Sequence, residues 1–396
     1  MPSSPTEQEP ALTAEPPSPA AVRVAVLTPP GRGAVATISV TGPQAAQLVA
    51  ANYRPAAGRP LTASPVGRII FGRWCPDQTP GDEVVVCRRG DDEVEVHCHG
   101  GRLAAGAIVS SLVAAGAVET PWSEFIASRE PGGLEAAARV ALAAVRTERA
   151  AAILLDQWRG ELRAALSCAA AGIQGEASAD AATILQGLIR SARVGLHLVE
   201  PWQVVLTGRP NVGKSSLLNA ILGYERCIVH ASPGTTRDVV TAQTALAGWP
   251  VELADTAGWR KSGDEIEAAG LAQAQTQLRQ ADLVVLVFDV TAGWTGEDQT
   301  LLAAWPEAVV VHNKCDLPAA DAPDRPPGLR VSATQRQGLD ELVRELSQRL
   351  VPEPPPPGSA VLFRREQLQG VQAASTALAA GDEPQAVAVL HRLLAD

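Results

Sequence analysis

The sequence predicts an α/β nucleotide-binding domain that is inserted into a helical domain and preceded by a small α+β domain. The first observation behind this prediction is G-x-x-x-x-G-K-S at 208–215, between an apolar strand pattern and a helical pattern. That is the setting of a phosphate-binding loop. The second is the return of short apolar strands between 202 and 350, which is typical of a mostly parallel sheet with helices on both faces. The third is the Ala-rich helical pattern over 119–200.

Changes in composition set the boundaries of these parts. The first 20 residues are mainly Pro, Ser, Glu and Ala, which predicts a disordered tail over 1–20. The proline-rich stretch 352–357 predicts a stiff linker. We therefore expect the α+β domain at 21–118, the helical domain at 119–200 and 352–396, and the α/β domain at 201–351.

The small domain shows short strand patterns bounded by turn residues. His97 and His99 lie on one face of its last strand, so a metal pair is one interpretation, but no third ligand is evident and an ordinary strand end is favoured. The helical domain shows long helical patterns. The expected strands are 22–28, 34–40, 67–74, 83–88 and 93–98, and the expected helices are 44–49, 103–115, 135–149, 150–170 and two within 360–396.

The α/β domain carries the phosphate loop after the first of its expected strands, which are 203–207, 250–254, 283–289 and 308–312. Glycines let the loop point its N–H groups at a phosphate, and the following helix adds its positive end. Lys214 is expected to reach the β- and γ-phosphates and Ser215 to hold magnesium. Of 33 basic residues only three are lysine, at 214, 261 and 314. A chain that otherwise uses arginine has kept lysine at two places where a point-charge ammonium or a slim aliphatic stem is expected to matter. The expected phosphate contacts are Asn211, Val212, Gly213, Lys214, Ser215 and Ser216.

Two further stretches complete the predicted phosphate site. Asp255-Thr256-Ala257-Gly258 is D-x-x-G at a strand end, where the Asp can hold magnesium through water and the Gly258 N–H can meet the γ-phosphate. Between it and the phosphate loop lies the hydroxyl-rich 234–238, in which Thr235 and Thr236 are expected to contact the nucleotide. Thr236 is the candidate for the second protein ligand of magnesium.

Asn313-Lys314-Cys315-Asp316 predicts the base. This is N-K-x-D after an apolar strand. The carboxylate of Asp316 can accept two N–H groups of guanine, and adenine offers no such donor pair, so an unpaired buried carboxylate penalises the wrong base. Ser332 and Ala333 follow the next strand, where a backbone N–H can meet the guanine oxygen. The predicted ligand is therefore GTP.

Composition excludes several other classes. The net charge of −10 does not attract nucleic acid to the molecule as a whole, so RNA binding needs a local basic patch. No apolar run approaches the roughly 20 residues of a membrane span, and we expect no membrane partner. The six cysteines are scattered without a C-x-x-C pair, and the N-terminus lacks a signal-peptide pattern. Reduced thiols and a cytoplasmic location are expected.

Together these motifs resemble the tRNA modification GTPases of the MnmE (TrmE) family. The stretches that carry the resemblance are 208–219, 233–238, 255–267 and 313–316 in the α/β domain, and 28–33, 40–43 and 96–101 near the N-terminus. The resemblance implies a folate-binding domain, a helical domain and an inserted GTPase domain. It implies GTP hydrolysis, homodimerisation with potassium bound by Asn211, and a water-positioning role for Glu267.

The resemblance also implies partners and a second ligand. Members bind 5-formyl-tetrahydrofolate in the N-terminal domain, for which Arg32, Gly100 and Gly101 are the candidates here. With the FAD-binding partner MnmG they modify the wobble uridine of tRNA. The family usually ends in C-x-G-K, whereas the last cysteine here is Cys315. Two alternatives stay open, a divergent GTPase switch that modifies no tRNA, and a ribosome-assembly GTPase, for which 358–396 lacks a basic or G-x-x-G module.

Overall fold

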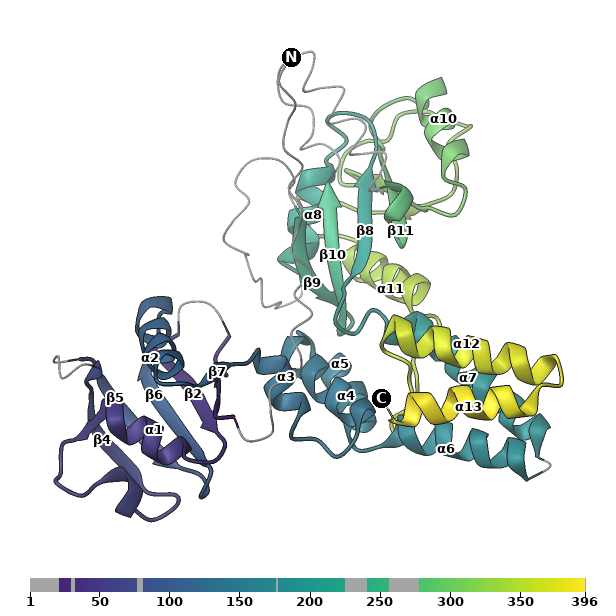
Figure 1. Cartoon of the computed structure of the whole chain (residues 1–396). Coiled ribbons are helices and arrows are strands. Elements are labelled where there is room, and N and C mark those ends of the chain that lie inside the picture. The colour runs from purple at the N-terminus through teal and green to yellow at the C-terminus, as the bar shows by residue number, and fades with distance from the viewer. Residues whose placement is uncertain are drawn as a thin grey trace, which may run out of the picture. The chain divides into compact units, whose positions relative to one another are not determined.

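The fold is known from a computed structural model, which describes residues 21–29, 33–76, 81–175, 177–224, 241–255 and 278–395. The chain forms two compact units, one up to Arg129 and one from Glu130 onwards. Each unit is built around its own sheet or helices, and the labels used below are those of Figure 1. None of the described helices is both long enough and apolar enough to cross a membrane.

The first unit is a seven-stranded sheet in the order β3-β4-β5-β6-β2-β1-β7. Neighbouring strands are antiparallel except for β1 and β7, which are parallel. The strands are β1 (Arg23–Val26), β2 (Val35–Thr41), β3 (Tyr53–Pro55), β4 (Ile69–Trp74), β5 (Glu83–Arg88), β6 (Glu93–His99) and β7 (Val118–Glu119). The helices are α1 (Ala45–Asn52), α2 (Arg102–Ala114) and α3 (Trp122–Ala127), with a 3-10 turn at Leu61–Ala63.

Alternating apolar residues fix one face of this sheet. Along β6, Val94, Val96 and Cys98 are buried while the residues between them are not, as expected for a strand with one covered face. These buried side chains join those of α1 and α2 in one core, and both helices lie against the sheet in Figure 1. The strands and helices predicted for this region are thus present, with the short β3 and β7 in addition.

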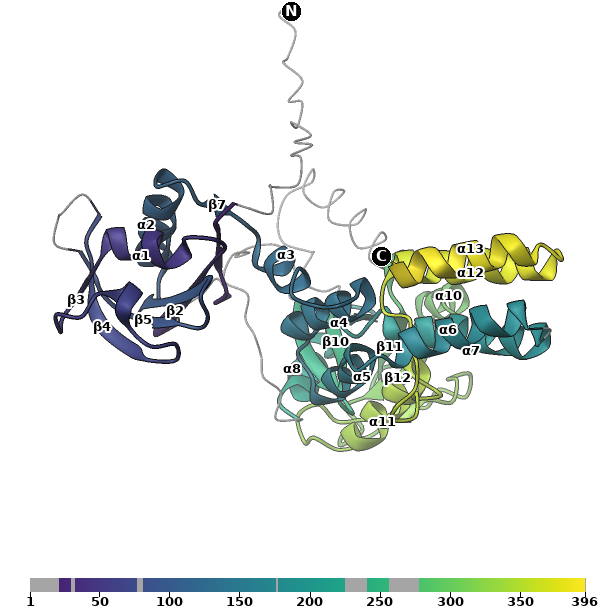
Figure 2. The same cartoon turned by 60° about the horizontal axis from the view of Figure 1, so that its bottom comes forward.

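The helical part of the second unit packs α6 and α7 beside the C-terminal pair α12 and α13, and Figure 2 shows the two pairs as two layers. The predicted helices over 135–149 and 150–170 are wrong in their boundaries. The Thr147 side chain caps the start of α5 by accepting from the Ala150 N–H, and Gly160, with a left-handed φ of 107°, separates α5 from α6. The helices are α4 (Gly133–Ala144), α5 (Glu148–Trp158), α6 (Glu161–Gln174), α7 (Ser178–Gly195), α12 (Arg365–Ala379) and α13 (Glu383–Ala395).

The second unit also contains a six-stranded sheet in the order β13-β12-β11-β8-β10-β9. All neighbours are parallel except β9 and β10, which form an antiparallel hairpin, so the predicted, mostly parallel sheet is confirmed and β9 is an addition to it. The strands are β8 (Trp202–Thr207), β9 (Thr241–Leu246), β10 (Trp249–Asp255), β11 (Leu283–Asp289), β12 (Val309–Asn313) and β13 (Leu329–Arg330). The helices are α8 (Lys214–Leu222), α10 (Gly296–Ala304) and α11 (Leu339–Leu350).

Candidate nucleotide-binding site

The phosphate loop joins β8, a central strand of the sheet, to the start of α8. Gly213 is the N-cap of α8 with a left-handed φ of 94°, and an added Cβ would lie 2.3 Å from Asn313 Nδ2. A larger residue at 213 is therefore excluded by both backbone conformation and space. The loop therefore leads directly into the N-terminus of α8, the end of a helix that favours an anion.

Lys214 is buried under this loop and held by it. Its side chain is 5% exposed, and its Nζ donates to the carbonyl of Gly208 at 3.0 Å and to the carbonyl of Arg209 at 2.8 Å. These contacts hold the ammonium under the predicted phosphate loop. Val212 is buried, whereas Asn211, Ser215 and Ser216 are exposed.

Ser215 and Asp255 are brought together, although they lie 40 residues apart in the sequence. The Ser215 hydroxyl donates to the carboxylate of Asp255, which is 2% exposed at the end of β10. A hydroxyl and a carboxylate beside a phosphate loop are the oxygen donors that magnesium prefers. The described part of this site therefore offers oxygen donors of the kind that suit the ion.

Asn313 connects the phosphate loop with the segment that follows β13, the two halves of the predicted site. It is 2% exposed at the end of β12. Its Nδ2 donates to the carbonyl of Val212 at 2.9 Å, and its Oδ1 accepts from the Ala333 N–H at 3.2 Å. One buried amide thus fixes the phosphate loop to the segment that follows β13. In this structure the Ala333 N–H, predicted to meet the guanine oxygen, is directed at Asn313.

Lys314 is held by Asp289, which sequence reasoning missed. The Lys314 Nζ donates to Asp289 Oδ2 at 2.6 Å and to the carbonyl of Asn211 at 2.9 Å. Burial would raise the pKa of Asp289, but hydrogen bonds from Lys314 and Thr291 outweigh it and bring that pKa below its usual value. The only sequence signal for Asp289 was an acidic residue at the end of an apolar strand.

Asp316 and Ser332 are the remaining described residues of the predicted guanine site. Asp316 is exposed, so the predicted penalty for a wrong base applies only when a bound base covers this carboxylate. Ser332 is fully buried, and its Oγ accepts from the Gln335 N–H at 3.1 Å. That contact makes Ser332 a support of the loop around Ala333.

Several predicted residues lie outside the described part of the chain. They are Arg32, Thr235, Thr236, Thr256, Ala257, Gly258 and Glu267. In the first unit, Gly100 packs so closely on the backbone of Gly33 that an added Cβ would lie 1.7 Å from the Gly33 carbonyl oxygen, and Gly101 is the N-cap of α2. Among the residues that the structure describes, no group of three His, Cys, Asp or Glu side chains is placed to hold a metal. His97 hydrogen-bonds Thr37 instead, at 3.1 Å.

Both units match known protein families in sequence. Residues 23–128 match the family model described as "GTP-binding protein TrmE N-terminus", and residues 203–314 match "50S ribosome-binding GTPase". The chain is 33% identical to the tRNA modification GTPase MnmE of Moorella thermoacetica, over 82% of this chain and 80% of that protein. It is also 33% identical to that of Chloroflexus aurantiacus, over 83% and 81%. Among solved structures, the G domain of the T. maritima FeoB iron transporter matches 38% of this chain and 99% of its own, with 24% identity and a TM-score of 0.28.

Proposed function

The chain belongs to the MnmE family of tRNA modification GTPases and is a GTP hydrolase, and from this premise we propose that its GTPase cycle serves the modification of tRNA. The observation that carries the proposal is that the likeness to the MnmE relatives covers 82% of the chain and includes both the N-terminal unit and the GTPase domain. A GTPase domain alone would be compatible with many outputs.

The residues of the nucleotide site take distinct parts in this proposal. Lys214 turns its ammonium from loop carbonyls to the β- and γ-phosphates, and Asp316 accepts from guanine. Ser215 and Thr236 are the proposed protein ligands of magnesium, which when bound neutralises charge between these phosphates. The remaining proposed nucleotide contacts are Asn211, Val212, Gly213, Ser216, Thr235, Asp255, Thr256, Ala257, Gly258, Asn313, Lys314, Ser332 and Ala333.

Hydrolysis needs an oriented water and stabilisation of the charge that develops on the phosphate. Glu267 is the proposed residue that orients the water. Asn211 is the proposed potassium ligand, and its left-handed φ of 64° is supported by its carbonyl, which accepts from Lys314. Potassium bound there would supply positive charge beside the phosphates.

The output of the cycle is the finer part of the proposal. We infer that the chain acts as a homodimer with an FAD-binding partner of the MnmG type. The inferred product is a 5-carboxymethylaminomethyl-type modification of the wobble uridine. The N-terminal unit is the proposed site for 5-formyl-tetrahydrofolate, with Arg32, Gly100 and Gly101 as candidates. The alternative is a GTPase switch that hydrolyses GTP and modifies no tRNA.

Mass spectrometry of tRNA tests the proposal. The gene is supplied to a strain that lacks its own copy of this activity, either as the wild type or as Lys214→Ala. We expect modified wobble uridine with the wild type and unmodified uridine with Lys214→Ala. Unmodified uridine with a wild-type protein that hydrolyses GTP in vitro would overturn the proposed output and favour the switch.

A further inference from the structure

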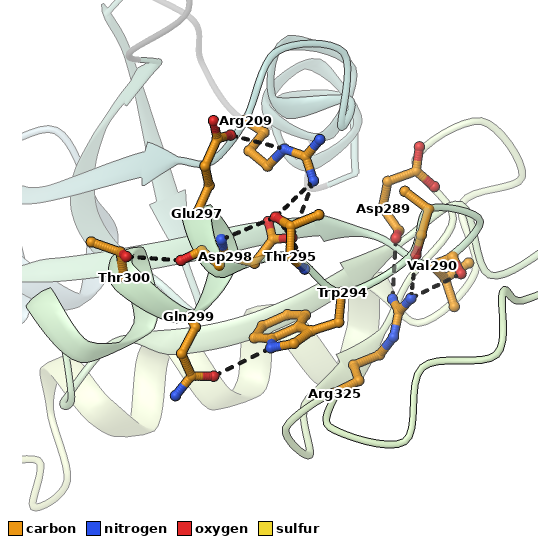
Figure 3. Close-up of polar contacts among 12 residues, drawn as sticks. Arg209, Asp289, Val290, Trp294, Thr295, Glu297, Asp298, Gln299, Thr300 and Arg325 are labelled. Carbon is orange, nitrogen blue, oxygen red and sulfur yellow. Dashed lines mark hydrogen bonds and ion pairs between the residues drawn. The ribbon is translucent and has the colours of Figure 1, made fainter.

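The second residue of the phosphate loop, Arg209, is held by the start of helix α10. Its Nη1 donates to Asp298 Oδ2 at 3.1 Å and to Thr295 Oγ1 at 3.2 Å. A third partner, Glu297, lies 3.5 Å from Nε but is 80% exposed, so it contributes little. Figure 3 shows the guanidinium directed at this helix start. Arg209 therefore ties the loop to an element that follows β11.

Asp298, the acceptor in this contact, is held in place by burial and by its own hydrogen bonds. It is 4% exposed, and its Oδ2 also accepts from the Thr295 N–H at 3.0 Å and from the Thr295 hydroxyl at 2.7 Å. This is the capping box of α10, which fixes the carboxylate at a helix N-terminus. A buried carboxylate needs a hydrogen-bonded cation, and Arg209 supplies it.

The loop that leads to α10 is itself braced. Arg325 donates to three of its carbonyls, those of Asp289 at 3.1 Å, Val290 at 3.2 Å and Ala292 at 2.6 Å, and Figure 3 shows its contacts with Asp289 and Val290. Trp294 packs on Phe288 of β11, with ring centroids 4.8 Å apart. Asp298 is thus anchored to the central sheet and does not depend on the phosphate loop for its position.

We propose that Asp298 is a positioning residue for GTP hydrolysis, which acts through Arg209 to hold the phosphate loop in its binding conformation. The path has two steps. Asp298 holds the guanidinium of Arg209, and the backbone carbonyl of the same Arg209 accepts from Lys214 Nζ at 2.8 Å. Fixing Arg209 therefore fixes the loop above the ammonium that meets the phosphates.

This role predicts a kinetic signature. A loop that is held in place before the nucleotide binds favours the bound ground state and the transition state equally. Loss of the Arg209–Asp298 contact that holds the loop should therefore raise KM and leave kcat nearly unchanged. An arginine that met the phosphate only in the transition state would lower kcat instead. The guanidinium of Arg209 is engaged with α10, which favours the first signature.

The test uses the full-length chain and measures kcat and KM for GTP together with the thermal unfolding midpoint. Arg209→Ala and Asp298→Asn are each expected to raise KM about tenfold, and the double variant no further, because both break one contact. Asp298→Asn keeps an acceptor for the helix cap and so keeps the fold. Arg209→Lys restores the charge and should recover most of the loss in KM. Glu297→Gln, which alters the exposed partner of the same arginine, should leave KM unchanged.

Two results would overturn the proposal. A lower kcat in Arg209→Ala with normal kinetics in Asp298→Asn would make Arg209 a group that acts on the phosphates directly. A lower unfolding midpoint in Asp298→Asn with unchanged KM would reduce Asp298 to a helix cap.

Discussion

Replacing Asn313 by alanine removes a side chain that joins the phosphate loop to the segment after β13. The hydrogen bonds from Nδ2 to the Val212 carbonyl at 2.9 Å and from the Ala333 N–H to Oδ1 at 3.2 Å disappear, together with a long one from Nδ2 to the Gly213 carbonyl at 3.5 Å. Because Asn313 is 2% exposed, water cannot replace these partners without rearrangement. Each lost bond costs about 1 kcal/mol, and an unsatisfied buried partner raises the total to about 2–3 kcal/mol.

The consequence is measurable in two ways. A loss of that size lowers the unfolding midpoint of a unit this large by about 4–6 °C. The same loss frees the carbonyl of Val212, so the phosphate loop is no longer held and the Kd for GTP should rise at least about tenfold, which corresponds to about 1.4 kcal/mol. Differential scanning calorimetry and titration with a fluorescent GTP analogue measure the two effects.

Asn219→Ala is the matched control, because it makes the same change at an exposed position of α8. We expect it to change the unfolding midpoint and the Kd for GTP little. If Asn313→Ala behaved like this control in both assays, the inference that Asn313 bridges the two halves of the site would be wrong.

Three further changes test other parts of the account. Asp289→Asn removes the charge that holds Lys314 at 2.6 Å and should weaken GTP binding about five- to tenfold in the same titration, whereas unchanged affinity would argue against this support. Gly213→Ala would place a Cβ 2.3 Å from Asn313 Nδ2 and should abolish GTP binding, so retained binding would contradict the described loop. Glu135 of α4 accepts hydrogen bonds from Arg163, and these bring the pKa of its carboxyl below the ordinary value of 4.5. The ionised Glu135 therefore stabilises the fold above the unfolded-state pKa, and this contribution is lost as the pH falls through the folded-state pKa. The difference in unfolding midpoint between wild type and Glu135→Gln should therefore shrink on acidification, and a constant difference would refute the linkage.

Much of the site could be predicted from sequence because its conformations are encoded locally. The phosphate loop needs glycine at fixed places, and Asn313 and Lys314 follow an apolar strand whose end lies at the same sheet edge as the loop. The strand at 283–289 was predicted with the bounds that the structure has, since seven consecutive apolar or strand-ending residues leave little choice in a buried parallel strand.

The remaining features depend on long-range contacts that no local pattern records. Arg209 and Asp298 lie 89 residues apart, and neither residue type is unusual where it stands. Strand β9 was missed because Thr241–Leu246 mixes Ala and Gln with only two buried positions, and its pairing with β10 decides its structure. The helix break before Glu148 depends on the Thr147 cap, which competes with an Ala-rich sequence of high helix propensity.

The measurement that tests the central claim most directly is the nucleotide specificity of the wild type and of Asp316→Asn. The wild type should hydrolyse GTP and not ATP. Asp316→Asn should lose GTP and gain activity with xanthosine triphosphate, because xanthine carries a carbonyl where guanine has its amino group and an asparagine can donate to it. Undiminished GTP hydrolysis by Asp316→Asn would contradict the claim that this edge of the sheet binds guanine.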